Sequence, residues 1–227
     1  MKFLSHGLVV LVLLAMVTPA LAEVKVTGDA YVNYSSMYLW RGFDLSNGDP
    51  VAQGGMDLSF KGLTLSYWSN YNLKNSQLDE TDITVDYSYA PSDLVTLNVG
   101  NILYSVSGSD TSEVYAGVSL NTLLSPSLTA YYDYDQFSGD VYVAASIGHS
   151  FELQKGLSLN LGALASYVDN DDYSNLHNAE FSAGLDYAVT DQISLSPSVV
   201  YSTPLSDDAD NAIDDEFLAG LTLTLSF

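Results

Sequence analysis

The sequence contains no cysteine and, beyond its first 22 residues, no long run of apolar residues. Without cysteine the chain forms no disulfides and carries no cysteine-linked lipid anchor. Because it has no apolar run of about 20 residues, the remaining chain cannot cross a bilayer as a helix. If this chain belongs to a membrane, only a closed β-barrel satisfies its backbone hydrogen bonds there.

Basic residues are also scarce, with 6 lysines and arginines against 28 aspartates and glutamates, a net charge of −22. This balance argues against nucleic acid as a partner and favours cations. The chain has 3 histidines, of which His149 and His177 lie beyond residue 22. The strand pattern places His149 near the inner end of a strand and His177 in an outer loop, so they cannot share a catalytic site. We therefore expect no enzyme, no cofactor and no histidine-based metal centre.

The first 22 residues have the pattern of a secretory signal peptide. Lys2 gives a positive start, residues 8–17 are an apolar run, and Pro19 precedes the small-x-small sequence Ala20-Leu21-Ala22. The run is about half the roughly 20 residues that a spanning helix needs, which argues against a membrane anchor. We expect cleavage after residue 22 and one domain over residues 23–227.

The region after residue 22 is rich in two-residue alternation between apolar and polar side chains, the period of a β-strand. In the last segment one face is apolar, and the other is polar except for Leu218: the apolar face comprises Phe217, Ala219, Leu221, Leu223, Leu225 and Phe227. An even number of strands is expected in a single-chain barrel, and about twelve such segments are found. They begin near residues 24, 51, 63, 81, 94, 113, 127, 141, 157, 178, 193 and 216.

The connections between these segments alternate between short turns and longer polar loops. Short turns are expected at residues 61–62, 90–93, 121–126, 152–156 and 190–191. In outer-membrane barrels short turns face the periplasm and long loops face outside, which makes both termini periplasmic. Two positions fit less well: Asn101 falls on the lipid face unless a bulge shifts the strand, and Pro197 lies within a strand.

A soluble β-sandwich also has short alternating strands, but it does not explain two bands of outward-facing aromatic residues near the strand ends. The outer band is Tyr34, Tyr71, Tyr134, Tyr167 and Tyr201, and the inner band is Phe60, Tyr89, Tyr187 and Phe227. We therefore predict an all-β fold, a transmembrane antiparallel up-and-down β-barrel in the outer membrane. Its expected partners are outer-membrane lipids, lipopolysaccharide and the insertion machinery, which would recognise the terminal strand ending at Phe227.

One segment is not explained by alternation. It reads Tyr38-Leu39-Trp40-Arg41-Gly42-Phe43-Asp44-Leu45-Ser46, followed by Gly48-Asp49-Pro50 and Gln53-Gly54-Gly55-Met56-Asp57. This segment resembles the N-terminal signature of the TorF-type porins, also called Gcw_chp proteins, over about residues 30–70. Asp44-Leu45 stands where family members commonly have serine and glutamine. The resemblance implies an outer-membrane porin-like barrel and says little about its substrate.

Candidate functional residues are those that the alternation places on the lumen face, where carboxylates stay ionised at low cost. Arg41 is expected either to fold into the lumen opposite Asp57 or Asp29 as a constriction, or to tether its loop structurally. Tyr115 and Tyr142 also point inward, and the inward aromatic residues either form a ladder for sugar-like solutes or fill space. The candidate pore-lining set is Arg41, Asp29, Tyr31, Asp57, Trp68, Asp82, Asp86, Glu113, Tyr131, Asp133, Glu180 and Asp186.

Aspartates also cluster in two expected outer loops, near residues 169–172 and 207–216. Carboxylates can bind divalent cations, but neither run has the spacing of an EF-hand loop, so solvated loops are the favoured interpretation. The weak metal candidates are Asp169, Asp171, Asp172, Asp207, Asp208 and Asp210.

Two functional hypotheses follow from these patterns. The first is a channel for passive diffusion of small hydrophilic solutes, with mild cation selectivity because its lumen is acidic. The second is a non-conducting structural or adhesive barrel whose acidic outer loops carry the function.

Overall fold

The computed structural model of the protein describes residues 25–227, in which twelve strands close into an antiparallel barrel, as predicted. The predicted signal peptide lies outside the described residues. The barrel strands are β1 (Thr27–Ser35), β4 (Val51–Phe60), β5 (Leu63–Asn72), β6 (Gln77–Tyr89), β7 (Val95–Val106), β8 (Thr111–Leu120), β9 (Ser127–Asp133), β10 (Val141–Gln154), β11 (Leu157–Asp169), β12 (Ser174–Ala188), β13 (Ile193–Pro204) and β14 (Glu216–Ser226).

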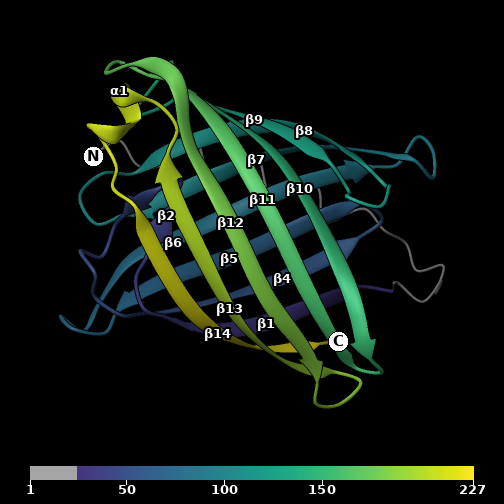
Figure 1. Ribbon diagram of the computed structural model, residues 1–227. Helices are drawn as coiled ribbons and strands as arrows, with labels where there is room; N and C mark the ends of the chain where they lie inside the picture. Colours follow the sequence, from purple (N-terminus) through teal and green to yellow (C-terminus); the bar gives the residue numbers. More distant parts are fainter. Residues whose placement is uncertain (1–24) are drawn as a thin grey trace, which may run out of the picture.

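Two short elements lie outside the barrel wall. Strands β2 (Leu39–Trp40) and β3 (Phe43–Asp44) pair with each other in the connection between β1 and β4. Helix α1 (Asp207–Asp210) lies in the connection between β13 and β14, at the end of the barrel opposite the C-terminus (Figure 1). No helix among residues 25–227 is long and apolar enough to cross a membrane.

The first and last strands close the barrel. β1 pairs with β4 on one side and with β14 on the other. The closure ends in a reciprocal backbone pair, in which Gly28 N donates to Phe227 O and Phe227 N donates to Gly28 O, each at 2.9 Å. A β-carbon at Gly28 would lie 2.3 Å from the Asp57 carbonyl oxygen and 3.1 Å from the Phe227 ring. Glycine therefore lets the terminal aromatic ring pack against the start of β1.

The exterior of the barrel is apolar, whereas its interior is largely polar. Only six hydrophobic residues of the described chain are buried, while large apolar side chains along the strands are exposed, as for Leu223 at 46% and Val32 at 52%. Both predicted aromatic bands lie among the exposed side chains, with Tyr34 at 54% and Phe227 at 53%. A soluble sandwich would bury these faces. The exterior is that of a barrel surrounded by lipid.

The strands extend further at the outer end than the sequence indicates, because β6, β8 and β12 begin before the predicted starts at residues 81, 113 and 178. The prediction of long outer loops is therefore wrong for residues 73–76, 107–110 and 170–173. It holds for residues 36–50, 134–140 and 205–215.

The two irregular positions are accommodated without a shift of register. β7 pairs continuously with β6 and β8, so no bulge moves Asn101 from the lipid face. Its amide instead donates to the Glu113 carbonyl at 2.8 Å and to the Tyr134 hydroxyl at 2.9 Å. Pro197 pairs with Leu221 of β14, while the pairing of β13 with β12 is interrupted beside it, because proline has no N–H to donate.

Deleting Phe227 should impair insertion into membranes. The deletion removes both closing backbone bonds, each worth about 0.5–1.5 kcal/mol, together with an aromatic side chain at the interface. Assembly into lipid vesicles can be followed by the heat-dependent gel mobility of the folded barrel. Phe227→Tyr is the control, since it keeps the ring and the backbone pair. Insertion of the deleted chain at the wild-type yield would refute this role for Phe227.

Candidate functional site

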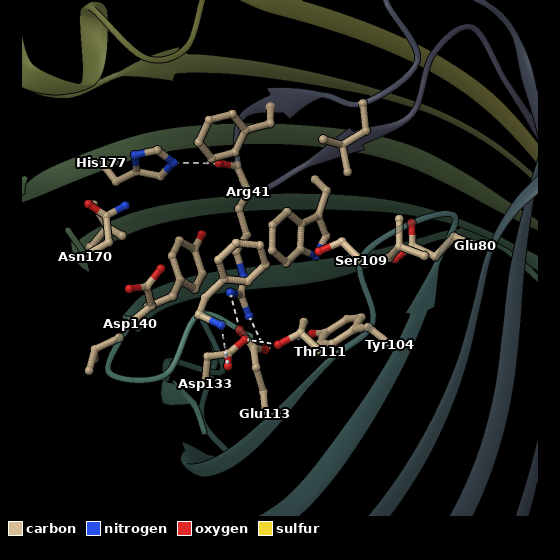
Figure 2. A pocket seen from close by; sticks show the side chains of 18 residues that line it. Arg41, Glu80, Tyr104, Ser109, Thr111, Glu113, Asp133, Asp140, Asn170 and His177 are labelled. Carbon is tan, nitrogen blue, oxygen red and sulfur yellow. Dashed lines mark hydrogen bonds and ion pairs between the residues drawn. The ribbon is translucent and has the colours of Figure 1, made fainter. Parts of the chain in front are cut away.

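The β2–β3 hairpin folds inward at the outer end of the barrel (Figure 2). Its two-residue turn consists of Arg41 and Gly42, with φ angles of 50° and 87°. Two successive positive φ values are typical of the type I′ turn, which matches the twist of a hairpin. Arginine rarely adopts such a conformation, so its side-chain contacts must hold it there.

The tip of this hairpin is bound to the barrel wall by a bidentate ion pair. Nη1 and Nη2 of Arg41 donate to Oε1 and Oε2 of Glu113 on β8, both at 2.8 Å, and the Tyr104 hydroxyl donates to Oε2 at 2.8 Å. The two charged side chains are only 14% and 7% exposed. Of the two expectations for Arg41, the geometry matches the tether, because its loop is bound through the Glu113 carboxylate. Asp57 and Asp29 lie on β4 and β1, several strands away from β8, and form no ion pair with Arg41 in the described chain.

Aromatic rings surround the Arg41 guanidinium. Its central carbon lies 4.4 Å from the ring centre of Trp40, 4.7 Å from that of Tyr131 and 4.3 Å from that of Tyr142. Burial lowers the pKa of Arg41, but the hydrogen bonds and charge of Glu113 more than offset this, and the net shift is upward. Arg41 therefore stays charged, and its charge is balanced within the site.

Three of the five inward-facing aromatic residues, Tyr115, Tyr131 and Tyr142, form a ladder across β8, β9 and β10. Tyr115 and Tyr131 have ring centres 5.4 Å apart, and those of Tyr131 and Tyr142 are 6.1 Å apart. The rings of Tyr131 and Tyr142 are in contact with Arg41. The Tyr115 ring lies over Gly100, where an added β-carbon would be 2.4 Å from the ring. The part of the ladder beside the hairpin therefore packs against the protein's own arginine.

His177 binds the backbone of the hairpin tip. Its Nε2 lies 2.7 Å from the Arg41 carbonyl oxygen, and its Nδ1 lies 2.5 Å from the Tyr173 hydroxyl. Because the carbonyl can only accept, Nε2 is the donor. The prediction of His177 in an outer loop is wrong: it lies in β12, is 1% exposed, and belongs to a bulge that places it with Asn178 opposite Ser166. The bulge brings a histidine into the lumen that alternation would not place there.

The rest of the signature segment supports the hairpin. Tyr38 is buried against Trp68 of β5, with ring centres 5.5 Å apart, and the Tyr38 N–H donates to Ser46 Oγ at 2.8 Å. Burial, together with the charge of Glu80, raises the pKa of the Tyr38 hydroxyl. Asp44 accepts bonds from the N–H groups of Ser46 and Gly48 and so fixes the following turn.

The Gln-Gly-Gly part of the signature lies in the barrel wall beside the hairpin. Gln53 joins Asn33 and Asn70 through hydrogen bonds of 3.1 and 3.2 Å. Tyr31 lies over Gly55, where a β-carbon would be 2.6 Å from its hydroxyl oxygen. Gln53 therefore links two asparagines on the lumen wall through its amide, and Gly55 leaves room for the Tyr31 ring.

A cavity of about 340 Å³ lies beside the hairpin at the outer end of the barrel. Its walls come from the hairpin, from β6 to β12, and from the loops at residues 107–110, 134–140 and 170–173. Leu45 and Phe137, which line it, are 47% and 51% exposed, so the cavity reaches the outer surface. The lining residues are Trp40, Arg41, Phe43, Leu45, Glu80, Tyr104, Val106, Ser109, Thr111, Glu113, Asp133, Phe137, Asp140, Val141, Tyr142, Val168, Asn170 and His177.

The remaining predicted carboxylates are distributed over the lumen wall rather than gathered at Arg41. Asp29 and Asp57 are direct cross-strand partners, and Asp82 lies between Trp68 and Tyr104, with Oδ1 buried and without a partner in the described chain. Asp86 accepts from Tyr115, Asp186 from Asn160 and Ser196, and Glu180 from Asn178. Asp133 accepts from Thr111 and from the N–H groups of Asp135 and Phe137, so it fixes the loop at residues 134–140.

The acidic outer loops do not form a metal site in the described chain. Residues 25–227 contain no group of three or more histidine, aspartate or glutamate side chains arranged to hold a metal ion. Within the outer loop at residues 205–215, Asp207–Asp210 form the short helix α1, with Ser206 as its N-cap. The pKa of the Asp140 carboxyl is raised by burial and by the negative charges of Asp171, Asp133, Asp172 and Asp169. This part of the mouth is therefore strongly negative.

Sequence reasoning did not identify several residues of the site, namely Trp40, Tyr104, Asp140, His177 and Asn178. Tyr104 and Asn178 follow the alternation of their strands and so could have been included with the lumen-facing residues. His177 and Asp140 carry no such signal, because a bulge and a loop place them.

No family model and no curated protein sequence matches the chain, so its likeness to the TorF-type porins stays a prediction. Solved structures match in fold. The NanC porin superposes with a TM-score of 0.63 at 15% identity, over 88% of this chain and 100% of that one. The KdgM porin in complex with disordered oligogalacturonate gives 0.59 at 14% identity, over 88% and 99%. The COG4313 outer membrane channel from Pseudomonas putida F1 gives 0.52 at 13% identity, over 93% and 100%.

At these identities the matches establish the fold. Together with the lipid-type exterior and the polar lumen, they define the class of the protein: it is an outer-membrane β-barrel with the architecture of twelve-stranded porins.

Replacing Glu113 by alanine should release the hairpin from the lumen. A buried arginine left without its carboxylate costs about 3–5 kcal/mol, so the hairpin gains by moving Arg41 into water. We expect a higher single-channel conductance and faster protease cleavage within residues 36–50. Asp110→Ala, which removes a mouth carboxylate not bonded to the hairpin, should leave both unchanged. If the Glu113 variant has wild-type conductance and wild-type protection, the ion pair does not hold the hairpin.

Replacing Gly42 by alanine should displace the same hairpin without changing any charge. A β-carbon at Gly42 would lie 2.8 Å from Ile213 Cδ1 and 3.3 Å from Asn178 Cβ. Gly48→Ala is a matched control, since Gly48 also has a positive φ of 72° but open space around its added β-carbon. We expect a red shift of tryptophan emission from Trp40 and a larger conductance for Gly42→Ala alone. Equal effects of both substitutions would show that backbone strain, and not packing, is responsible.

Proposed function

We propose that the protein is a narrow outer-membrane channel for passive diffusion of small hydrophilic solutes, with a preference for cations and with its constriction at the β2–β3 hairpin. The observation that carries the proposal is the distribution of charge along the barrel axis. Both basic residues at the outer end are paired, Arg41 with Glu113 and Lys74 with Asp49 at 2.7 Å. The carboxylates around them are thus left without basic partners in the described chain.

The other described basic residues lie at the periplasmic end. Lys25 precedes β1 on the side of the C-terminus, and Lys61 and Lys155 lie in the short turns between β4 and β5 and between β10 and β11. An acidic outer mouth raises the local concentration of cations and lowers that of anions. The carboxylates on the lumen wall, among them Asp29, Asp57 and Asp86, extend the same preference inward.

A channel is favoured over an enzyme by the positions of the two described histidines, and the porin-like matches are consistent with it. The matching structures described above are named as porins or as an outer membrane channel. His149 lies near the periplasmic turn, where its Nδ1 is 2.6 Å from the Leu123 carbonyl oxygen. His177 lies at the outer end with both ring nitrogens engaged by the hairpin and Tyr173. Neither is placed to activate a serine as a general base.

A non-conducting barrel is the second candidate function, and the hairpin is the observation that favours it. The hairpin contacts side chains of β7, β8, β9, β10 and β12, and the preceding Tyr38 contacts β5, so this connection occupies much of the outer half of the lumen. Planar-bilayer recording separates the two candidates directly. Stepwise currents support the channel, and insertion without any current supports the closed barrel.

The reversal potential under a KCl gradient should show preference for potassium over chloride. The preference should be greater at low salt, because the screening length is about 10 Å at 0.1 M and about 3 Å at 1 M. The double variant Asp29→Asn and Asp57→Asn should reduce it, whereas Asp191→Asn in a periplasmic turn should not. A reversal potential that indicates chloride preference would contradict the proposal.

A further inference from the structure

We propose that the cavity beside the hairpin is a binding site for a small organic ammonium ion with an apolar or aromatic body. The proposal rests on the proposed function in one respect, since such a cation is the class of solute that the acidic mouth would attract. It goes further by assigning a defined site, and a ligand chemistry, to residues at the outer end of the barrel.

The shape and lining of the cavity fit the body of such a ligand. A volume of about 340 Å³ is at the lower end of the roughly 300–1,000 Å³ range of small-molecule sites. Aromatic residues from separate elements line it: Trp40 and Phe43 from the hairpin, Tyr104 from β7, Tyr142 from β10 and Phe137 from the 134–140 loop. Aromatic faces bind both apolar groups and organic cations. Because Phe137 is half exposed at the rim, a ligand can enter from outside the cell.

The charges around the cavity fit a cationic head group. Arg41 is the only lysine or arginine among the described lining residues, and Glu113 neutralises it. The other nitrogen base, His177, has both ring nitrogens engaged by the Arg41 carbonyl and the Tyr173 hydroxyl. Three further carboxylates line the cavity, Glu80, Asp133 and Asp140, so its net charge is negative.

Asp140 is the most available of these carboxylates. Asp133 is engaged by Thr111 and by two loop N–H groups, whereas no hydrogen bond to the Asp140 carboxylate is found within residues 25–227. Glu80 and Asp140 lie on opposite sides of the cavity (Figure 2). Asp169, Asp171 and Asp172 add negative charge near Asp140, and nothing in the described chain offsets it. We therefore assign Asp140 as the group that receives the ammonium.

The same lining opposes an acidic ligand. An anionic sugar would face three carboxylates without a free basic residue, and like charges at close range repel. The solute of this cavity is thus opposite in charge to the oligogalacturonate with which the KdgM porin was solved.

Three probes of nearly equal shape test the proposal: phenethylammonium, neutral 2-phenylethanol and anionic phenylacetate. Isothermal titration of the full barrel in detergent micelles measures their binding without requiring conduction. We expect phenethylammonium to bind most tightly and phenylacetate least. Asp140→Asn should weaken phenethylammonium binding about tenfold, as expected for loss of one close charge, and leave 2-phenylethanol unchanged. Glu80→Gln is a second variant at the other side of the cavity, and it should weaken the ammonium probe but not the neutral one.

Asp214→Asn is the control, because it removes a mouth carboxylate that does not line the cavity. Equal binding of the three probes, no binding of phenethylammonium, or preference for a neutral sugar such as glucose would each overturn the proposal. So would an Asp140→Asn variant that binds phenethylammonium like the wild type. Cation-preferring currents without binding would overturn only the binding site, and binding without currents would overturn only the channel.

Discussion

The buried ion pair between Arg41 and Glu113 determines the shape of the upper lumen. A connection such as residues 36–50 would ordinarily extend into water, but its arginine lies against the wall of β8 and among the rings of Trp40, Tyr131 and Tyr142. Burying two charges costs free energy that their attraction repays only when the geometry is good, so such a pair adds little net stability. Breaking it is costly, however. The pair therefore acts by fixing one position of the hairpin, and the cavity, the aromatic contacts and the narrowing of the lumen all depend on that position.

The sequence predicts the barrel closely because strand periodicity is local. The segment from Phe217 to Phe227 shows which side chains face lipid and which face the lumen, and the same rule assigns Asp29, Asp57 and Glu113 inward. It does not indicate which of these inward carboxylates pairs with Arg41. The carboxylate that pairs with Arg41 depends on the position of the hairpin in the lumen. That position is set by the packing of Gly42 against Ile213 and Asn178 and by the hydrogen bond from His177. His177 itself could not be predicted, because a single extra residue in β12 reverses the alternation at that point.

The segment at residues 38–57, which resembles the TorF-type porins, forms one connected structure in and beside the hairpin. Its glycines, tyrosine and serine form a tight hairpin held over the lumen, and Gln53 and Gly55 form the wall beside it. Asp44, which stands where the TorF-type porins that this segment resembles commonly have serine, accepts hydrogen bonds from two backbone N–H groups of the following turn. This role requires only a side chain that accepts hydrogen bonds from two backbone N–H groups, so an aspartate at position 44 is compatible with the hairpin.

Neutralisation of Arg41 also decides the sign of the outer mouth. A free arginine beside Glu80, Asp133 and Asp140 would place opposite charges across a narrow passage and would attract anions as well as cations. Glu113 accepts hydrogen bonds from Nη1 and Nη2 of Arg41 and from the Tyr104 hydroxyl, so the charges of Arg41 and Glu113 balance each other. The pair thus contributes a polar obstacle with no net charge. The net charge of the outer mouth is then set by the remaining carboxylates, Glu80, Asp133 and Asp140. The ion pair thus determines the width of the passage, and these carboxylates determine its charge.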